Sequence, residues 1–134
     1  MERRLVSSGS AFESSVGYSR AVRVGNLVFV SGTTATDGRG GVVALGDPYG
    51  QAREILDRIG EALAGAGCGP SDVVQTRVYV TDVSRWEEVG RAHGEVFGEV
   101  RPATTIVGVR GLVSPEMLVE IEAVAVAPPV DRGE

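Results

Sequence analysis

The chain has 134 residues, of which 43% are hydrophobic and 23% are charged, as in an ordinary soluble globular domain. Its net charge of −5 disfavours nucleic acid and anionic membrane surfaces as partners, since both are bound through basic patches. No apolar window reaches the roughly 18 residues of a membrane-spanning helix, and the N-terminus lacks a signal peptide's apolar stretch. We therefore expect a single cytoplasmic domain over residues 1–134.

The only cysteine, Cys68, has no partner for an internal disulfide and no His or second Cys at a zinc-binding spacing. It stands between glycines just after a predicted helix. We interpret it as a small loop residue rather than a reactive thiol, and we predict no metal site.

The first half of the chain predicts a hairpin and a helix. Residues 1–17 are mostly loop, with at most one short strand around residues 4–6. Two β-branched runs then flank Gly25-Asn26, a strong hairpin signal within residues 21–31. After a glycine-rich crossover, Asp47-Pro48 is typical of a helix start, and the helix should end near Gly65 or Gly67. Its apolar stripe at helical spacing consists of Ala52, Ile55, Leu56, Ile59, Ala62 and Leu63.

The second half predicts three strands and another helix. Residues 73–80 alternate as a strand does, and Ser84 opens a capping box for a helix that stops before Pro102. The inner face of this helix would carry Trp86, Val89, His93, Val96 and Phe97. Residues 101–126 read as two strands joined by a Ser-Pro turn, and residues 128–134 as a frayed tail.

One carboxylate interrupts the last strand. Glu120 lies in an apolar run, where burying a charge is costly unless it has partners or a task. Glu120 is therefore the first candidate functional residue, and we favour a role in the site over a buried salt bridge.

These elements predict an α/β (α+β) fold, a mixed sheet of five to six strands with two helices on one face. Residues 28–30, 106–107 and 121–126 are apolar on both strand faces, so two helices cannot cover all of this surface. At about 25 cal/mol per Å² of apolar area, leaving the second face wet would exceed a domain's marginal stability. We therefore expect an obligate homo-oligomer.

The sequence resembles the RidA/YjgF family, also called endoribonuclease L-PSP-like, over nearly its whole length. The matching segments, in order, are Val16-Gly17-Tyr18-Ser19-Arg20-Ala21, residues 24–32, Ala66-Gly67 before Asp72-Val73-Val74, Arg101-Pro102-Ala103 and residues 119–125. The resemblance implies a chorismate-mutase-like fold assembled as a homotrimer, with small-molecule clefts between subunits. It also implies hydrolysis of reactive imines and enamines to 2-keto acids and ammonia, without metal or organic cofactor.

The resemblance also implies roles for individual residues. Tyr18 would line the cleft, Ser31 and the Gly32 backbone would form its floor, and Glu120 would activate water and shuttle protons. Thr33 follows this floor where relatives have a Gln-containing turn, and Ile106 stands where deaminating relatives often have a small or thiol residue.

One departure from the family concerns the substrate's carboxylate. Deaminating relatives bind it with an arginine directly after Pro-Ala, whereas this chain has Thr104. Losing a charge-assisted pair worth about 1.5–3 kcal/mol lowers carboxylate affinity at least about tenfold. We therefore do not expect typical 2-imino acid deamination through this anchor. Compensation by Arg20, Arg101 or Arg110 is an alternative, but we favour a solvated surface charge for each.

Three further interpretations stay open. His93 is the only histidine, and we favour a hydrogen-bonded core residue over a catalyst. Glu122 shares the strand face of Glu120, but the resemblance selects Glu120. Tyr18 is as compatible with packing at a hairpin entrance as with lining a cleft.

Three functional hypotheses follow. The first is a cofactor-free hydrolase of imines, enamines or similar metabolites, acting through Glu120 and water. The second is a non-catalytic trimer whose clefts bind a small metabolite. The third is ribonuclease or translation-inhibitor activity, which the acidic composition disfavours.

Overall fold

The computed structural model describes residues 2–129, and the remainder of the predicted frayed tail, residues 130–134, lies outside them. Six strands form one sheet in the order β1-β2-β3-β6-β4-β5. The elements are β1 (Arg3–Val6), β2 (Ala21–Val24), β3 (Leu27–Thr33), α1 (Pro48–Gly65), β4 (Val73–Val80), α2 (Trp86–Phe97), β5 (Ala103–Gly108) and β6 (Val119–Val126). The predicted mixed sheet with two helices is confirmed.

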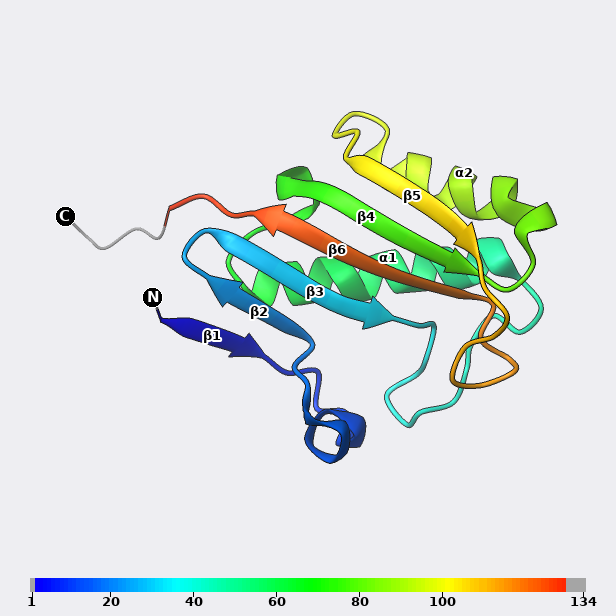
Figure 1. The fold of residues 1–134 in the computed structure, drawn as a ribbon, viewed down its shortest axis with the longest axis horizontal. Coiled ribbons are helices and arrows are strands. Elements are labelled where there is room, and N and C mark those ends of the chain that lie inside the picture. Colours follow the sequence, from blue (N-terminus) through cyan, green and yellow to red (C-terminus); the bar gives the residue numbers. More distant parts are fainter. Residues whose placement is uncertain (1, 130–134) are drawn as a thin grey trace.

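Both helices cover the same face of the sheet (Figure 1). Because side chains alternate along a strand, every second residue of the central strands enters the core between sheet and helices. Its largest fully buried side chains include Ile55, Ile59, Leu63, Val78 and Ile121. The other face of the sheet, which we call the open face, carries the intervening residues.

Helix α1 begins and ends as the sequence predicts. The Asp47 side chain accepts a hydrogen bond from the Gly50 N–H at 3.0 Å, which caps the first turn, and Pro48 follows at the first helical position. Gly67, with a φ of +85°, reverses the chain after the last turn.

The start of α2 differs from the prediction. The Ser84 hydroxyl donates to Asp82 at 2.6 Å, residues Val83–Arg85 form a 3₁₀ turn, and α2 starts at Trp86 without a side-chain cap. The predicted capping box at Ser84 is therefore wrong. Trp86, expected on the inner face, is 50% exposed, whereas Val89 and Phe97 are buried.

The last two strands are not sheet neighbours, contrary to what a Ser-Pro turn between them suggests. Strand β6 inserts antiparallel between β3 and β4, whereas β5 pairs parallel with β4 at the sheet edge. Residues 109–118 make this connection without strand structure. Two registers matter for function: Glu120 lies opposite Tyr79, and Thr104 lies opposite Thr76.

The N-terminal segment adds an edge strand and one unpredicted turn. Strand β1 pairs antiparallel with β2. Residues Glu13–Gly17 form a single π-helical turn, which is held by Ser8, whose hydroxyl donates to Glu13 at 2.6 Å. No helix within residues 2–129 is long and apolar enough to cross a membrane.

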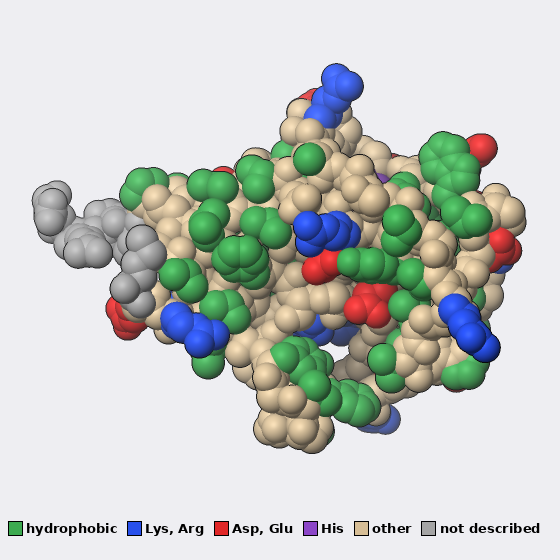
Figure 2. Space-filling view, viewed as in Figure 1, with side chains coloured by type: hydrophobic (Ala, Val, Ile, Leu, Met, Phe, Trp, Pro, Cys, Tyr) green, Lys and Arg blue, Asp and Glu red, His purple; other side chains and the backbone are tan. Residues whose placement is uncertain are grey.

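The open face carries hydrophobic side chains toward its ends and both acidic and basic side chains in its middle (Figure 2). Large hydrophobic side chains exposed on its strands are Leu27, Phe29, Val74, Val107 and Val126, each between 39% and 46% exposed. Large hydrophobic side chains exposed together on one sheet face are typical of an interaction site. Homotrimerisation stays a prediction.

Candidate functional site

Glu120 lies on the open face of β6, half-buried and directly over Gly32 of the neighbouring strand. A Cβ atom at residue 32 would come within 2.0 Å of the Glu120 Oε2 atom. Only glycine therefore leaves room for this carboxylate, which explains the residue type at position 32.

A bulge in β3 shapes the backbone around Gly32. The register between β3 and β6 shifts between Val30 and Thr33, as happens often beside functional sites. The Ser31 hydroxyl donates to the Ser19 carbonyl at 2.7 Å, and the Thr33 hydroxyl donates to the Ser31 carbonyl at 2.8 Å. Thr33 is only 2% exposed, so it supports the bulge from beneath.

Arg20 joins this group, although the sequence favoured a solvated surface charge. Its Nη2 atom donates to the Gly32 carbonyl at 2.6 Å, and its guanidinium carbon lies 5.7 Å from the centre of the Tyr18 ring. The signal was present in the sequence, because residues 18 and 20 share one side of an extended segment. We call Tyr18, Arg20, Gly32 and Glu120 the carboxylate cluster.

Burial raises the pKa of Glu120 above its ordinary value. The nearby Arg20 cation lowers this pKa in part, and the Glu122 carboxylate raises it. Within residues 2–129 no cationic nitrogen lies within 4.0 Å of the Glu120 carboxylate. A half-buried carboxylate that is not ion-paired and has a raised pKa can accept a proton from water and return it.

Glu122 is engaged differently from its neighbour two residues away. The Tyr79 hydroxyl donates a hydrogen bond to the Glu122 carboxylate, and Arg77 approaches the same carboxylate at 3.9 Å. This hydrogen bond raises the pKa of Tyr79. Glu122 is thus occupied within the chain, which agrees with assigning the chemistry to Glu120.

Thr104 and Ile106 lie on the opposite side of the sheet. The Thr104 hydroxyl is 2.8 Å from the Thr76 hydroxyl, which is itself 2.8 Å from His93 Nε2 on α2. Ile106 packs against the core between sheet and helices. One chain therefore gathers Tyr18, Ser31, Gly32 and Glu120 but does not bring Thr104 or Ile106 to them.

His93 belongs to this second group, which we call the hydroxyl chain: His93, Thr76 and Thr104. The ring is half-buried against Phe97, with 4.8 Å between ring centres. Burial lowers the pKa of His93, so the ring is neutral at neutral pH. His93 is thus a hydrogen-bonded residue at the edge of the core and does not approach Glu120.

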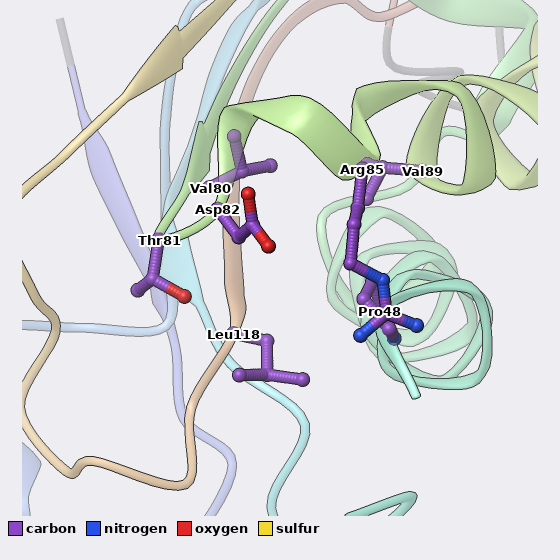
Figure 3. Close-up of a pocket in the computed structure, with 7 residues that line it drawn as sticks. All are labelled: Pro48, Val80, Thr81, Asp82, Arg85, Val89 and Leu118. Carbon is purple, nitrogen blue, oxygen red and sulfur yellow. The ribbon is translucent and has the colours of Figure 1, made fainter. Parts of the chain in front are cut away.

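Two hollows lie near these groups. A shallow one of about 600 Å³ borders the carboxylate cluster, between β1, β2 and the π-helical turn, and both Tyr18 and Ser31 line it. A smaller cavity of about 110 Å³ lies at the far end of β4 (Figure 3). Of its two charged side chains, Arg85 is ion-paired with Glu88, and Asp82 accepts hydrogen bonds from the N–H and the hydroxyl of Ser84.

Within residues 2–129 no group of three His, Cys, Asp or Glu side chains could hold a metal ion. The carboxylate cluster offers a group capable of acid–base chemistry, Glu120, beside the Arg20 cation and the Gly32 carbonyl.

Comparison with known proteins places the chain among characterised folds. Residues 8–127 match the family described as Endoribonuclease L-PSP. A solved member of the YjgF/YER057c/UK114 family from Mycobacterium tuberculosis is 52% identical, with a TM-score of 0.85 over 94% of this chain and 100% of that one.

Curated relatives extend the comparison. An uncharacterized protein of Streptomyces coelicolor is 41% identical over 96% of this chain and 95% of its own length. The 3-aminoacrylate deaminase RutC of Acinetobacter baylyi is 36% identical over 81% of this chain and 85% of its own. The match across residues 8–127, the shared fold and these identities together show that the chain belongs to the YjgF/RidA (endoribonuclease L-PSP) family.

Proposed function

We propose that the protein hydrolyses small imines or enamines without a cofactor, with Glu120 as the acid–base group. The observation that supports this most is the Glu120 carboxylate, which is half-buried, has a raised pKa and has no ion pair among the described residues. The relative named 3-aminoacrylate deaminase supports a deamination of this kind.

In the proposed reaction, Glu120 takes a proton from water while the water oxygen adds to the imine carbon. Glu120 then passes this proton to the imine nitrogen, and the neutral carbinolamine forms. In the second step Glu120 takes the proton of the carbinolamine hydroxyl and delivers it to the nitrogen, while the C=O bond forms, the C–N bond breaks, and a carbonyl compound and ammonia leave. An enamine enters the same sequence after one proton moves from its nitrogen to its carbon, and Glu120 ends as it began.

We also propose that the working cleft forms between subunits of a homotrimer. Thr104 and Ile106 lie on the helix side of β5, whereas Glu120 lies on the open face, so only a second copy could bring the two sets together. Burial of the exposed apolar side chains of the open face would stabilise this assembly. Sedimentation of the purified chain as a monomer would contradict it.

Turnover of a defined imine panel tests the hydrolase. Freshly generated 2-iminobutyrate and uncharged imines are offered to the wild type and to Glu120→Gln, and ammonia release is followed. We expect Glu120→Gln to lose about 10²- to 10⁴-fold in rate, the usual contribution of a general acid–base group. Glu122→Gln, on the same strand face, is the matched control and should retain turnover at neutral pH. The hydrolase proposal fails if no imine is consumed faster than in buffer.

A second candidate is a trimer that binds a small metabolite without converting it. Thr104 favours it, because the arginine of deaminating relatives is absent. It predicts saturable metabolite binding that Glu120→Gln leaves intact, together with no turnover. Endoribonuclease activity, the family's descriptive name, is disfavoured by the net charge of −5.

A further inference from the structure

We propose that Arg20 binds the carboxylate of the ligand, beside Glu120, in place of the arginine that position 104 lacks. The proposal rests on the cleft described under the proposed function and names its substrate class, a small 2-imino or 2-oxo acid. It reverses the interpretation of Arg20 as a surface charge.

The first support is that the charge of Arg20 is unpaired. Arg20 is half-buried, its Nε atom is buried without a hydrogen-bond partner, and no carboxylate within residues 2–129 lies within 4.0 Å of it. Removing a charge from water without a partner is costly. Such a group is expected where a ligand supplies the counter-charge.

Arg23, three residues later, shows how the same side chain is satisfied when its role is structural. Its guanidinium donates to the carbonyls of Gly25, Ala66 and Pro128 at 2.8 to 3.0 Å. Arg20 makes one such bond, to the Gly32 carbonyl. Arg23 therefore has a structural role, whereas Arg20 has N–H groups without an acceptor in the described structure.

The second support is that Arg20 is held in place before any ligand arrives. The Gly32 carbonyl fixes one terminal nitrogen at 2.6 Å, and the Tyr18 ring flanks the guanidinium. A fixed guanidinium loses little conformational freedom on binding, which favours affinity.

The third support is the relation of Arg20 to the carboxylate that would do the chemistry. Arg20 and Glu120 both contact Gly32, and Arg20 lowers the pKa of Glu120, yet the two side chains form no ion pair. In a 2-imino acid the imine carbon is bonded directly to the carboxylate carbon. A carboxylate on Arg20 therefore puts the reacting carbon next to Glu120.

The hydroxyl chain argues against a carboxylate at Thr104. The Thr104 hydroxyl has one proton, which is shared between the Pro102 carbonyl at 3.1 Å and the Thr76 hydroxyl at 2.8 Å. With either partner, the Thr104 oxygen presents only lone pairs outward. Lone pairs repel an anion, so an anionic ligand is better bound elsewhere.

Binding of two unreactive probes tests the proposal without requiring turnover. Calorimetry compares 2-oxobutanoate with 2-oxobutanamide on the wild type, Arg20→Gln, Arg20→Lys and Arg77→Gln. We expect Arg20→Gln to raise the Kd of the keto acid about tenfold or more and to leave the amide unchanged. Arg20→Lys should fall between, because it keeps the charge but not the fork. Arg77→Gln, on the same face, should behave as wild type.

The wild-type protein provides a second readout that no variant's folding can disturb. The Arg20 Nε–H resonance, assigned by its loss in Arg20→Lys, should shift when 2-oxobutanoate is added and stay in place with the amide. The proposal is overturned if the wild type binds acid and amide equally, or if Arg20→Gln binds the acid as wild type does. If imine hydrolysis is still observed after such a result, the Arg20 proposal fails and the hydrolase proposal is kept. If binding depends on Arg20 but no imine is turned over, the Arg20 proposal is kept and the hydrolase proposal fails.

Discussion

The carboxylate cluster and the hydroxyl chain treat polar groups in opposite ways. In the cluster, Glu120 and Arg20 lie near each other and remain without an ion pair within the described residues. In the hydroxyl chain, Thr76 lies within hydrogen-bond distance of both His93 and Thr104. Unpaired charge costs stability and is retained where it has a task. We therefore expect the proposed chemistry in the carboxylate cluster and a structural role for the hydroxyl chain.

Strand geometry explains why the carboxylate cluster and the hydroxyl chain lie on opposite faces of the sheet within one subunit. Residues of β4 and β5 paired in parallel register point to the same face, so Thr104 follows Thr76 toward α2. Glu120 is opposite Tyr79 in antiparallel register and points to the open face with it. Each region can therefore be altered without touching the other.

Filling the space beneath Glu120 should have the largest effect of the three predictions that follow. A Cβ at Gly32 would lie 2.0 Å from Oε2 and 3.0 Å from Cδ of Glu120, so Gly32→Ala must displace the carboxylate. A displacement near 1 Å costs about 10²-fold in rate. Because the contacted atoms belong to a flexible side chain, the fold should survive. Steady-state kinetics on the best imine substrate measures the loss.

Gly60→Ala is the matched control for this substitution. Gly60 lies inside α1, and nothing is within 4 Å of an added Cβ. The change should leave turnover unaltered and add about 1 kcal/mol of helix stability. Full activity in Gly32→Ala would mean that the chemistry does not depend on the position of Glu120.

The charges around Glu120 should shift the pH dependence in opposite directions. Catalysis needs the ionised carboxylate, so kcat/KM rises as pH passes the raised pKa of Glu120. Arg20→Gln removes a cation that lowers this pKa and should move the acidic limb to higher pH. Glu122→Gln removes an anion that raises it and should move the limb to lower pH. pH profiles of both variants at low salt measure the shifts.

If the acidic limb of kcat/KM moves in the same direction in Arg20→Gln and Glu122→Gln, or does not move in either, a group other than Glu120 controls it. Raising the ionic strength should shrink both shifts, because part of each interaction passes through solvent. If the shifts are the same at low and high ionic strength, the electrostatic explanation is contradicted.

Local patterns predicted the elements well and their neighbours less well. The Asp47-Pro48 cap depends on nearby sequence, and the structure has it. Residues 73–80 form the predicted strand, but its alternation holds only from Thr76 to Val80, because a register shift near its start leaves Val73 buried and Val74 exposed. The insertion of β6 between β3 and β4 depends on contacts between residues far apart in the chain. The Ser84 capping box failed because Asp82 caps a 3₁₀ turn over residues Val83–Arg85 instead, which moves the start of α2 to Trp86.

The same division applies to the candidate site. Glu120 was predicted because a carboxylate in an apolar strand is costly, a cost visible in the sequence alone. The sequence places Arg20 beside Tyr18, but its hydrogen bond to the Gly32 carbonyl was not predicted, because Gly32 lies in a register shift of β3 that spacing does not reveal. The side of the sheet taken by Thr104 follows from its register with Thr76, which spacing does not specify.

His93 offers the smallest effect, and it concerns stability alone. Burial lowers the His93 pKa, so between that lowered value and the ordinary value near 6.5 the unfolded chain binds more protons. Stability therefore falls as pH drops through this window, with a slope of at most about 1.4 kcal/mol per pH unit. His93→Gln keeps a polar group that can donate to or accept from the Thr76 hydroxyl and should remove this slope, which urea unfolding across the window measures.

Glu120 contributes a slope of the opposite sign, because its pKa is raised in the folded state and stability then falls as pH rises. The free energy of unfolding is measured against pH for the wild type and for His93→Gln. Because Glu120 is present in both proteins, the difference between the two curves gives the contribution of His93 alone. Unchanged turnover in His93→Gln would place the hydroxyl chain outside the chemistry. A loss comparable to that of Glu120→Gln would instead join the two regions, and a subunit contact would have to bring His93 to the cleft.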